Sequence, residues 1–273
     1  MSYRVGIKWT AVLLALALAV VLMAGCSKGD GGGSSAKGAN WPKDTDLSKL
    51  ALTEKEADLG MKVAGIEERG PDQILSDMTD MGDLSLGNGV PQPITAYLDK
   101  MKTTLQSWKP VKSYAVEFEG TGKNGESRAA ATLMLFEDAN GGKAAAQQFP
   151  DLITGFFNTV FPELKKALKQ QFQEQGGAIA QAIDVDKIFD MIKVGKVDVS
   201  KEGLSPETFA FEFRMPQLGD SEAQRSLILG TLHRNILATV TVDYTGKAAD
   251  ESSTKGAEQV ARAAYKKLQE KAP

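Results

Sequence analysis

Residues 225–244 read Arg225-Ser-Leu-Ile-Leu-Gly-Thr-Leu-His-Arg-Asn-Ile-Leu-Ala-Thr-Val-Thr-Val-Asp-Tyr244. Two runs rich in β-branched and apolar residues flank the turn His233-Arg234-Asn235, where Asn is suitable because it tolerates positive φ. The second run alternates in the way of a strand with one buried face. This stretch therefore predicts an antiparallel β-hairpin. The buried face of its second strand consists of Ile236, Ala238, Val240, Val242 and Tyr244.

The same two-residue period marks strands earlier in the chain. Large apolar residues alternate with small or charged ones over 114–119 and again over 209–214. Residues 128–137 are the expected partner of the first of these strands, and 120–127 form the loop between them. Because strands joined by short loops pair antiparallel, the sequence predicts an antiparallel sheet.

Helical periodicity follows these strands. Apolar residues recur at spacings of three and four over 94–108, 153–172 and 254–271. Thr53 and Glu56 fit a capping box, which predicts a helix over 51–62, and the Gly and Pro residues of 70–93 predict loops. We therefore predict an α+β fold, an antiparallel sheet with flanking amphipathic helices. The order of elements allows two related strand–strand–helix units.

The helix predicted over 153–172 carries an aromatic stripe on one face. A stripe of this kind packs against a sheet, or it lines an apolar cavity that takes a lipid or another hydrophobic ligand. The sequence leaves both interpretations open. The candidate ligand-facing residues are Phe156, Phe157, Val160, Phe161, Leu164, Leu168 and Phe172.

The N-terminal residues carry a targeting signal. Arg4 and Lys8 precede an uncharged apolar run, and the small residues of Ala24-Gly25-Cys26 follow it. A basic start, an apolar stretch and a small-residue cleavage site form a secretory signal. The apolar run of about 15 residues is shorter than the ~20 that span a bilayer. We predict a signal peptide over 1–25; the alternatives are an uncleaved anchor and cleavage at another site.

The composition of the chain after the signal peptide limits its domain organisation, its disulfides and its partners. Gly and Ser dominate residues 27–40, so we expect a flexible tether over 26–45 and a single α+β domain over 46–273. Cys26 is the only cysteine, which excludes an internal disulfide. Without residues 1–25 the chain has 30 basic and 35 acidic residues, a net charge of −5. This charge argues against nucleic acid and against an anionic membrane surface as partners.

Catalytic and ligand-binding motifs are weak throughout. Gly120–Gly125 matches G-x-G-x-x-G, but it lies between two predicted strands, where glycines serve a hairpin. The acidic segment Asp72–Asp83 lacks the residue order of an EF-hand. His233 is the only histidine, which excludes a site with two histidine ligands and leaves one candidate for a Ser-His-Asp triad. Its position beside the predicted turn, next to Arg234, predicts an exposed turn residue. We predict no metal site, no cofactor and no catalytic residue.

Several segments resemble known bacterial proteins. The N-terminus resembles a lipoprotein signal, with Met23 where Leu is usual, and this resemblance implies that Cys26 becomes the lipidated first residue of the mature protein. Met215-Pro-Gln-Leu-Gly-Asp220, residues 229–242 and the helix from Ala257 resemble uncharacterised bacterial lipoproteins and exported sensor-like proteins. Phe136-Glu-Asp-Ala139 is similar to the middle of the same families. The resemblance implies an α+β domain with an antiparallel sheet, and it implies no activity.

Two functions are consistent with these observations. The first is a non-catalytic lipoprotein, anchored by acyl chains such as palmitate on Cys26 to the cell membrane or outer membrane. Its domain faces outside the cytoplasm and binds an envelope protein or a hydrophobic ligand. The second is a cell-envelope hydrolase that uses paired carboxylates, which requires two acids at a set separation.

Overall fold

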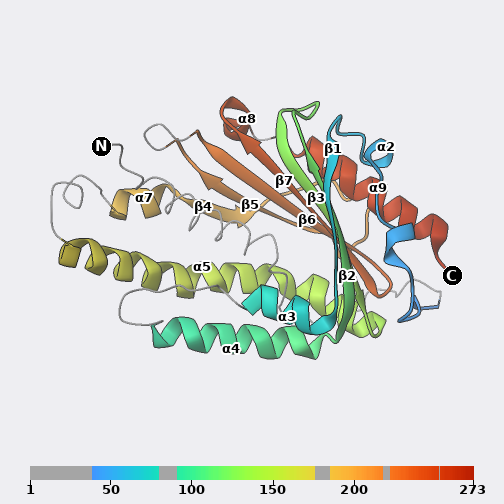
Figure 1. The fold of residues 1–273 in the computed structure, drawn as a ribbon, viewed down its shortest axis with the longest axis horizontal. Helices are drawn as coiled ribbons and strands as arrows, with labels where there is room; N and C mark the ends of the chain where they lie inside the picture. Colours follow the sequence, from blue (N-terminus) through green and yellow to red (C-terminus); the bar gives the residue numbers. More distant parts are fainter. Residues whose placement is uncertain (1–38, 80–90, 176–184, 218–221, 252) are drawn as a thin grey trace.

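Figure 1 shows the computed structural model, which describes residues 39–79, 91–175, 185–217, 222–251 and 253–273. The strands of these ranges form one antiparallel sheet of seven strands in the order β1-β2-β3-β7-β6-β5-β4. The α+β prediction is therefore confirmed. The strands are β1 (Lys62–Arg69), β2 (Pro110–Glu119), β3 (Glu126–Phe136), β4 (Lys193–Lys196), β5 (Phe209–Met215), β6 (Gln224–His233) and β7 (Ile236–Thr245).

The predicted C-terminal hairpin is present as β6 and β7. Its register places Arg225 opposite Tyr244 and His233 opposite Ile236. The turn between the strands is Arg234-Asn235, and Arg234 has a φ of 58°. Strand β7 also pairs with β3, so the two predicted hairpins, β2–β3 and β6–β7, are joined at the middle of the sheet.

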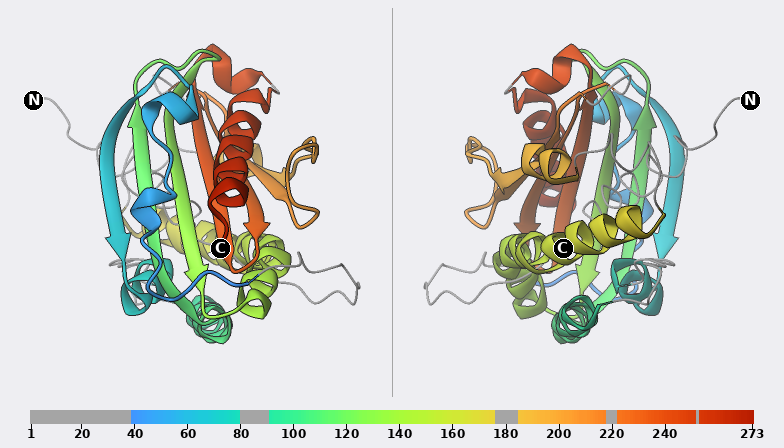
Figure 2. Two further views of the ribbon diagram at one scale, coloured as in Figure 1. Left: turned by 90° about the vertical axis from the view of Figure 1, so that its right-hand side faces the viewer. Right: turned by 90° about the vertical axis from the view of Figure 1, so that its left-hand side faces the viewer.

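Helices cover both faces of the sheet, as the two views of Figure 2 show. Because side chains alternate along a strand, Val240 and Val242 of β7 face α9 while Leu237 faces α4 and α5. Helix α2 and the short helix η1 pack on the α9 face, and α3 packs on the α4 face. The helices are η1 (Leu47–Lys49), α2 (Glu54–Ala57), α3 (Pro71–Thr79), α4 (Gln92–Ser107), α5 (Ala139–Gln175), α7 (Val185–Met191), α8 (Lys247–Asp250) and α9 (Lys255–Lys271).

The two strand–strand–helix units differ in how their helices pack. Hairpin β2–β3 is followed by α5 and hairpin β6–β7 by α8 and α9, which agrees with the predicted order. However, α5 contributes to one apolar core and α9 to the other, on opposite faces of the sheet. A rotation that superposed both pairs of strands would therefore leave the two helices on different sides.

The segment 51–79 departs most from expectation. The capping box of Thr53 and Glu56 is present, but α2 ends at Ala57 because Asp58 adopts the left-handed conformation, with a φ of 51°. Strand β1 then runs from Lys62, the predicted end of this helix, through residues 63–69, for which the sequence predicted no element. Helix α3 forms within residues 70–93, where loops were predicted. Strand β4 was not predicted either, and α5 continues from Ala139 through Pro150 and Pro162.

The N-terminal boundary of the packed chain lies before residue 46. Trp41 is buried in the core on the α9 face, although the predicted tether extends to residue 45. The predicted signal peptide and Cys26 lie outside the described residues. Among the helices that the structure describes, none combines the length and the apolar composition needed to cross a membrane.

Candidate functional site

Strand β1 forms one edge of the sheet, and in the described part of the chain no strand pairs with its outer side. Its eight residues are mostly exposed on both faces. Ile66 is 62% exposed and Val63 is 36% exposed. Within the described ranges these are the two large hydrophobic residues that the structure leaves exposed, and both lie on this one edge strand.

Both exposed side chains lie on the α9 face of the sheet. Val63 pairs with Phe118 and Ile66 pairs with Val116, and both residues of β2 belong to the core on that face. The register shifts between Val63 and Gly65, which is why residues three positions apart point the same way. Val63 and Ile66 therefore extend an apolar surface from the buried core to the open edge.

Charged side chains protect one end of this edge. Glu54 of α2 accepts a hydrogen bond of 2.9 Å from the main-chain N–H of Val63 and pairs with Lys62. The N–H bond from Val63, followed by the bond from Lys62, lowers the pKa of Glu54, so its carboxylate is charged when it binds there. This cover ends at Val63, and within the described part of the chain residues 64–68 remain as the open part of the edge.

The open part combines main-chain groups with an apolar side chain. An unpaired edge of this kind can accept a further strand through main-chain hydrogen bonds, with specificity from alternate side chains. Arg69 donates two hydrogen bonds to Glu67, of 2.9 and 2.5 Å, which neutralises two of the charges near Ile66. The arrangement can bind an extended peptide segment.

The phenylalanine stripe of α5 lies mainly in the core on the α4 face. Phe156, Val160 and Leu164 are buried there, and the Phe156 ring packs edge-on against Tyr97 at 6.4 Å between centroids. These three residues pack against protein atoms. A direct role in holding a ligand therefore needs a rearrangement of the core.

The remaining residues of the stripe are placed differently. Phe157 and Phe161 are half-buried, and their rings lie 6.0 Å from Phe213 and 4.6 Å from Phe189, respectively. Contacts with β5 and α7 therefore occupy part of each ring. The side chains of Leu168 and Phe172 lie outside the part of the chain that the structure describes.

The carboxylates of the sheet are relevant to the alternative function, a hydrolase that uses paired carboxylates. Asp243 of β7 accepts a hydrogen bond of 2.6 Å from Ser226, and burial raises the pKa of its carboxyl group more than Ser226 and Arg128 lower it. Arg128 also binds Glu117 at 2.7 Å. Among the described residues, no group of three or more His, Cys, Asp or Glu side chains is placed to hold a metal ion.

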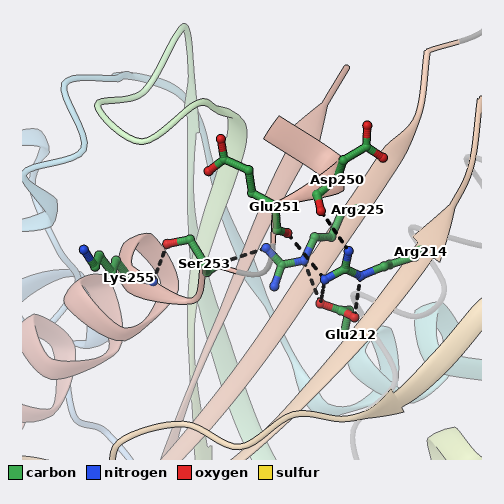
Figure 3. Close-up of polar contacts among 7 residues, drawn as sticks. All are labelled: Glu212, Arg214, Arg225, Asp250, Glu251, Ser253 and Lys255. Atoms are coloured by element: carbon green, nitrogen blue, oxygen red, sulfur yellow. Dashed lines mark hydrogen bonds and ion pairs between the residues drawn. The ribbon is translucent and has the colours of Figure 1, made fainter. Parts of the chain in front are cut away.

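Figure 3 shows a second polar cluster, at the ends of β5 and β6 near α8. The side chain of Arg225 is 1% exposed; it binds Glu212 and the main-chain oxygen of Ser253, each at 2.7 Å. Burial opposes ionisation of Glu212, but hydrogen bonds from Arg214 and Arg225 outweigh it, so its pKa is lowered. Arg214 also reaches the main-chain oxygen atoms of Asp250 and Glu251, at 3.5 and 3.4 Å. The cluster ties the segment before α9 to the sheet.

The G-x-G-x-x-G segment forms the β2–β3 hairpin, as predicted. It ends beside Glu126, a buried carboxylate that accepts bonds of 2.8 Å from the main chain and the side chain of Asn124. A Cβ atom at Gly122 or at Gly256 would overlap this carboxylate. The first part of the hairpin loop and the start of α9 therefore close around Glu126.

His233 lies at the end of β6. Its ring packs edge-on against Tyr265 at 5.6 Å, and burial, with the nearby charge of Arg234, lowers its pKa. The prediction of an exposed turn residue is wrong, because the side chain is buried. The fold therefore favours the neutral form of this histidine inside a packed end of the sheet.

Sequence reasoning missed the edge strand altogether. Residues 62–69 contain Val63 and Ile66 but no regular alternation, because four of the eight side chains are charged and the strand is bulged. Two β-branched residues beside Gly65 were the available signal. Such a signal does not distinguish an edge strand from a loop.

Comparisons with known proteins add little to this picture. No protein-family model matches the chain, and no curated protein matches its sequence. In structure the chain is similar to the extracellular domain of PknH from Mycobacterium tuberculosis, with 10% sequence identity and a TM-score of 0.42. The similarity covers 82% of this chain and 95% of that domain. A likeness of this extent assigns no function, so the function has to be inferred from this chain's own residues.

Proposed function

We propose that this protein is a non-catalytic lipoprotein whose domain binds a protein partner outside the cytoplasm through the open edge of β1. The observation that carries the proposal is the exposure of Ile66, 62%, on an edge strand without a partner in the described part of the chain. A large exposed apolar residue beside unpaired main-chain groups favours strand addition.

The hydrophobic-ligand hypothesis has less support. Three residues of the α5 stripe, Phe156, Val160 and Leu164, already contact other core residues. A ligand that used them would have to replace packing that stabilises the fold, since a buried side chain of this size contributes about 1.5–3 kcal/mol. The protein-partner hypothesis needs no such rearrangement.

Photo-cross-linking in the native envelope tests the proposal. A photoreactive amino acid at Ile66 should give a specific adduct with one partner protein, because the side chain is exposed on the binding edge. The matched control is Gln106, an exposed residue of α4. Equal adducts from both positions, or none from Ile66, would contradict the proposal.

Substitution of Ile66 gives a quantitative test once the partner is identified. Burying this side chain contributes about 1–2 kcal/mol, so Ile66→Lys should weaken binding by about 5- to 30-fold. Gln106→Lys introduces the same charge on a different surface and should leave the affinity unchanged. Isothermal titration calorimetry with the partner measures the affinity of both variants. Equal losses of affinity for Ile66→Lys and Gln106→Lys would show that Ile66 is not part of the interface.

Anchoring through Cys26 is a separate part of the proposal. Cys26→Ser should abolish acylation and lipoprotein-type cleavage, because the thiol that carries the lipid is gone. The wild-type protein should have the mass of a chain that starts at Cys26 plus its acyl groups. A Cys26→Ser protein with the wild-type mass in the membrane fraction would overturn the proposed anchor.

A further inference from the structure

The N-terminal end of the described chain is held by a buried amide. Asn235 is fully buried at the β6–β7 turn, and its side-chain oxygen accepts a hydrogen bond of 2.8 Å from the main-chain N–H of Trp41. Its side-chain nitrogen donates to the main-chain oxygens of Trp41 and Phe136, at 3.0 and 2.9 Å. One side chain therefore joins the turn, β3 and residue 41, although residue 41 is 194 positions away in sequence.

Arg234 fixes the chain two residues earlier. Its Nη1 atom donates to the main-chain oxygen of Ala39 at 2.7 Å and to that of Pro273 at 2.9 Å. In Figure 2 the N-terminal segment, in blue, crosses the end of the sheet where the C-terminus also lies. Residues 39–41 therefore leave the domain at one defined place, which we call the turn pole and define by Ala39, Trp41, Arg234, Asn235 and Pro273.

The distance from this pole to the proposed anchor is short. Ala39 follows Cys26 by 13 positions. A fully extended chain of that length spans about 45 Å, and a Gly/Ser-rich coil has a root-mean-square reach of about 20 Å. An acylated Cys26 must lie in the bilayer surface. The turn pole is thus the part of the domain that the anchor holds nearest to the lipid.

We propose that the turn pole faces the bilayer and that Asn235 and Arg234 set this orientation by clasping residues 39–41; the inference depends on the proposed acylation of Cys26. The partner of this surface is the lipid headgroup layer. Charged groups at the pole pair with each other, since Glu137 binds Lys43 at 2.5 Å and Lys109 at 3.2 Å. The tether, not net charge, therefore imposes the orientation.

The proposed orientation also determines how β1 lies relative to the bilayer. Its last residue, Arg69, pairs with Ser113 near the turn-pole end of β2, and its first, Lys62, pairs with Glu119 at the other end. The strand therefore runs toward the bilayer with its open edge facing sideways. An edge of eight residues is about 26 Å long and stays accessible to a partner in the envelope.

Single fluorescent probes on the lipidated full chain test the orientation. Asn140→Cys lies at the start of α5 near the turn pole, and Thr121→Cys lies in the β2–β3 loop at the opposite end; both residues are exposed. The 11 residues of β3 between these ends span about 35 Å. In phosphatidylcholine vesicles with a headgroup-attached quencher, the probe at 140 should be quenched several-fold more than the probe at 121, at low and high salt alike.

Two outcomes separate this inference from the proposed anchor. Equal quenching of both probes, or stronger quenching at 121, on protein that floats with vesicles overturns the orientation alone. Protein that does not float, and whose Cys26 still reacts with a maleimide, overturns the anchor itself. A lipidated Cys26 is a thioether and does not react, so the wild-type chain is the labelling control.

Substitutions test whether the contacts of Asn235 and Arg234 with residues 39–41 set the orientation. Asn235→Asp keeps the acceptor for Trp41 and removes the donors to Trp41 and Phe136, so the difference in quenching between the two probes should shrink while the circular dichroism stays native. Asn158→Asp on the exposed surface of α5 is the matched control and should keep the full difference. If Asn235→Asp fails to fold, Arg234→Gly replaces it, because Gly adopts the positive φ of this turn. If a natively folded variant without the contacts of Asn235 or Arg234 keeps the full difference in quenching between the two probes, these contacts do not set the orientation.

Discussion

Single residues carry charge states that the sequence does not reveal. Asp243 and His233 both have shifted pKa values, mainly because burial disfavours their charged forms. Burial also raises the pKa of Tyr244 to about 12, with its ring 5.3 Å from the guanidinium carbon of Arg225. None of these shifts is visible in the sequence, because each depends on which strand covers the side chain.

The raised pKa of Asp243 predicts a pH-dependent stability. Folded Asp243 binds the proton more tightly than unfolded Asp243, whose pKa is 3.8. The contribution of Asp243 to the free energy of unfolding should therefore rise as the pH falls from the folded pKa toward 3.8. Asp243→Asn should remove that rise, and Asp198→Asn, at an exposed residue, should keep it. Urea denaturation at a series of pH values measures both. Parallel pH profiles for the wild type and Asp243→Asn would contradict the assignment.

At the scale of elements, the β2–β3 hairpin and α9 meet at Glu126. Gly256→Ala should lower the free energy of unfolding by about 1–3 kcal/mol, because the added methyl group overlaps the buried carboxylate. The cost should fall when Glu126→Ala is also present, since that change opens the space. Gly70→Ala is the control, with no atom within 4 Å of its added Cβ. If Gly256→Ala and Glu126→Ala lower the free energy of unfolding additively in the double mutant, the contact between the two residues is excluded.

The elements also show how far local pattern can predict a fold. Hairpin β2–β3 was predicted because the burial of its side chains alternates. Strands β6 and β7 are buried on both faces and were predicted from their β-branched and apolar residues around a turn. Strand β1 has charged residues on an exposed edge, and β4 has only four residues, so neither shows a period. Helix α5 passes through Pro150 because packing against five strands and α4 outweighs a lost hydrogen bond. The candidate site lies on β1, so the sequence missed it together with the strand.

On the scale of the whole molecule, the two proposals assign different parts of the surface to different partners. The turn pole, with Asn235, holds the segment that leads to Cys26. The open edge of β1 lies at the side of the sheet, separated from β7 by two strands. The polar cluster of Arg225 lies at the opposite end of the β6–β7 hairpin, where it fixes the segment before α9. An anchored domain of this form presents a sheet edge to the envelope without using its core.

Amide hydrogen exchange with and without the partner tests the central claim most directly. Strand addition converts the outward-facing main-chain groups of residues 64–68 into hydrogen-bonded ones, so exchange of the outward-facing amides should slow strongly when the partner binds. Amides on the exposed surface of α4 should be unaffected. Slower exchange confined to another surface, with residues 64–68 unchanged, would contradict the assignment of β1 as the binding edge.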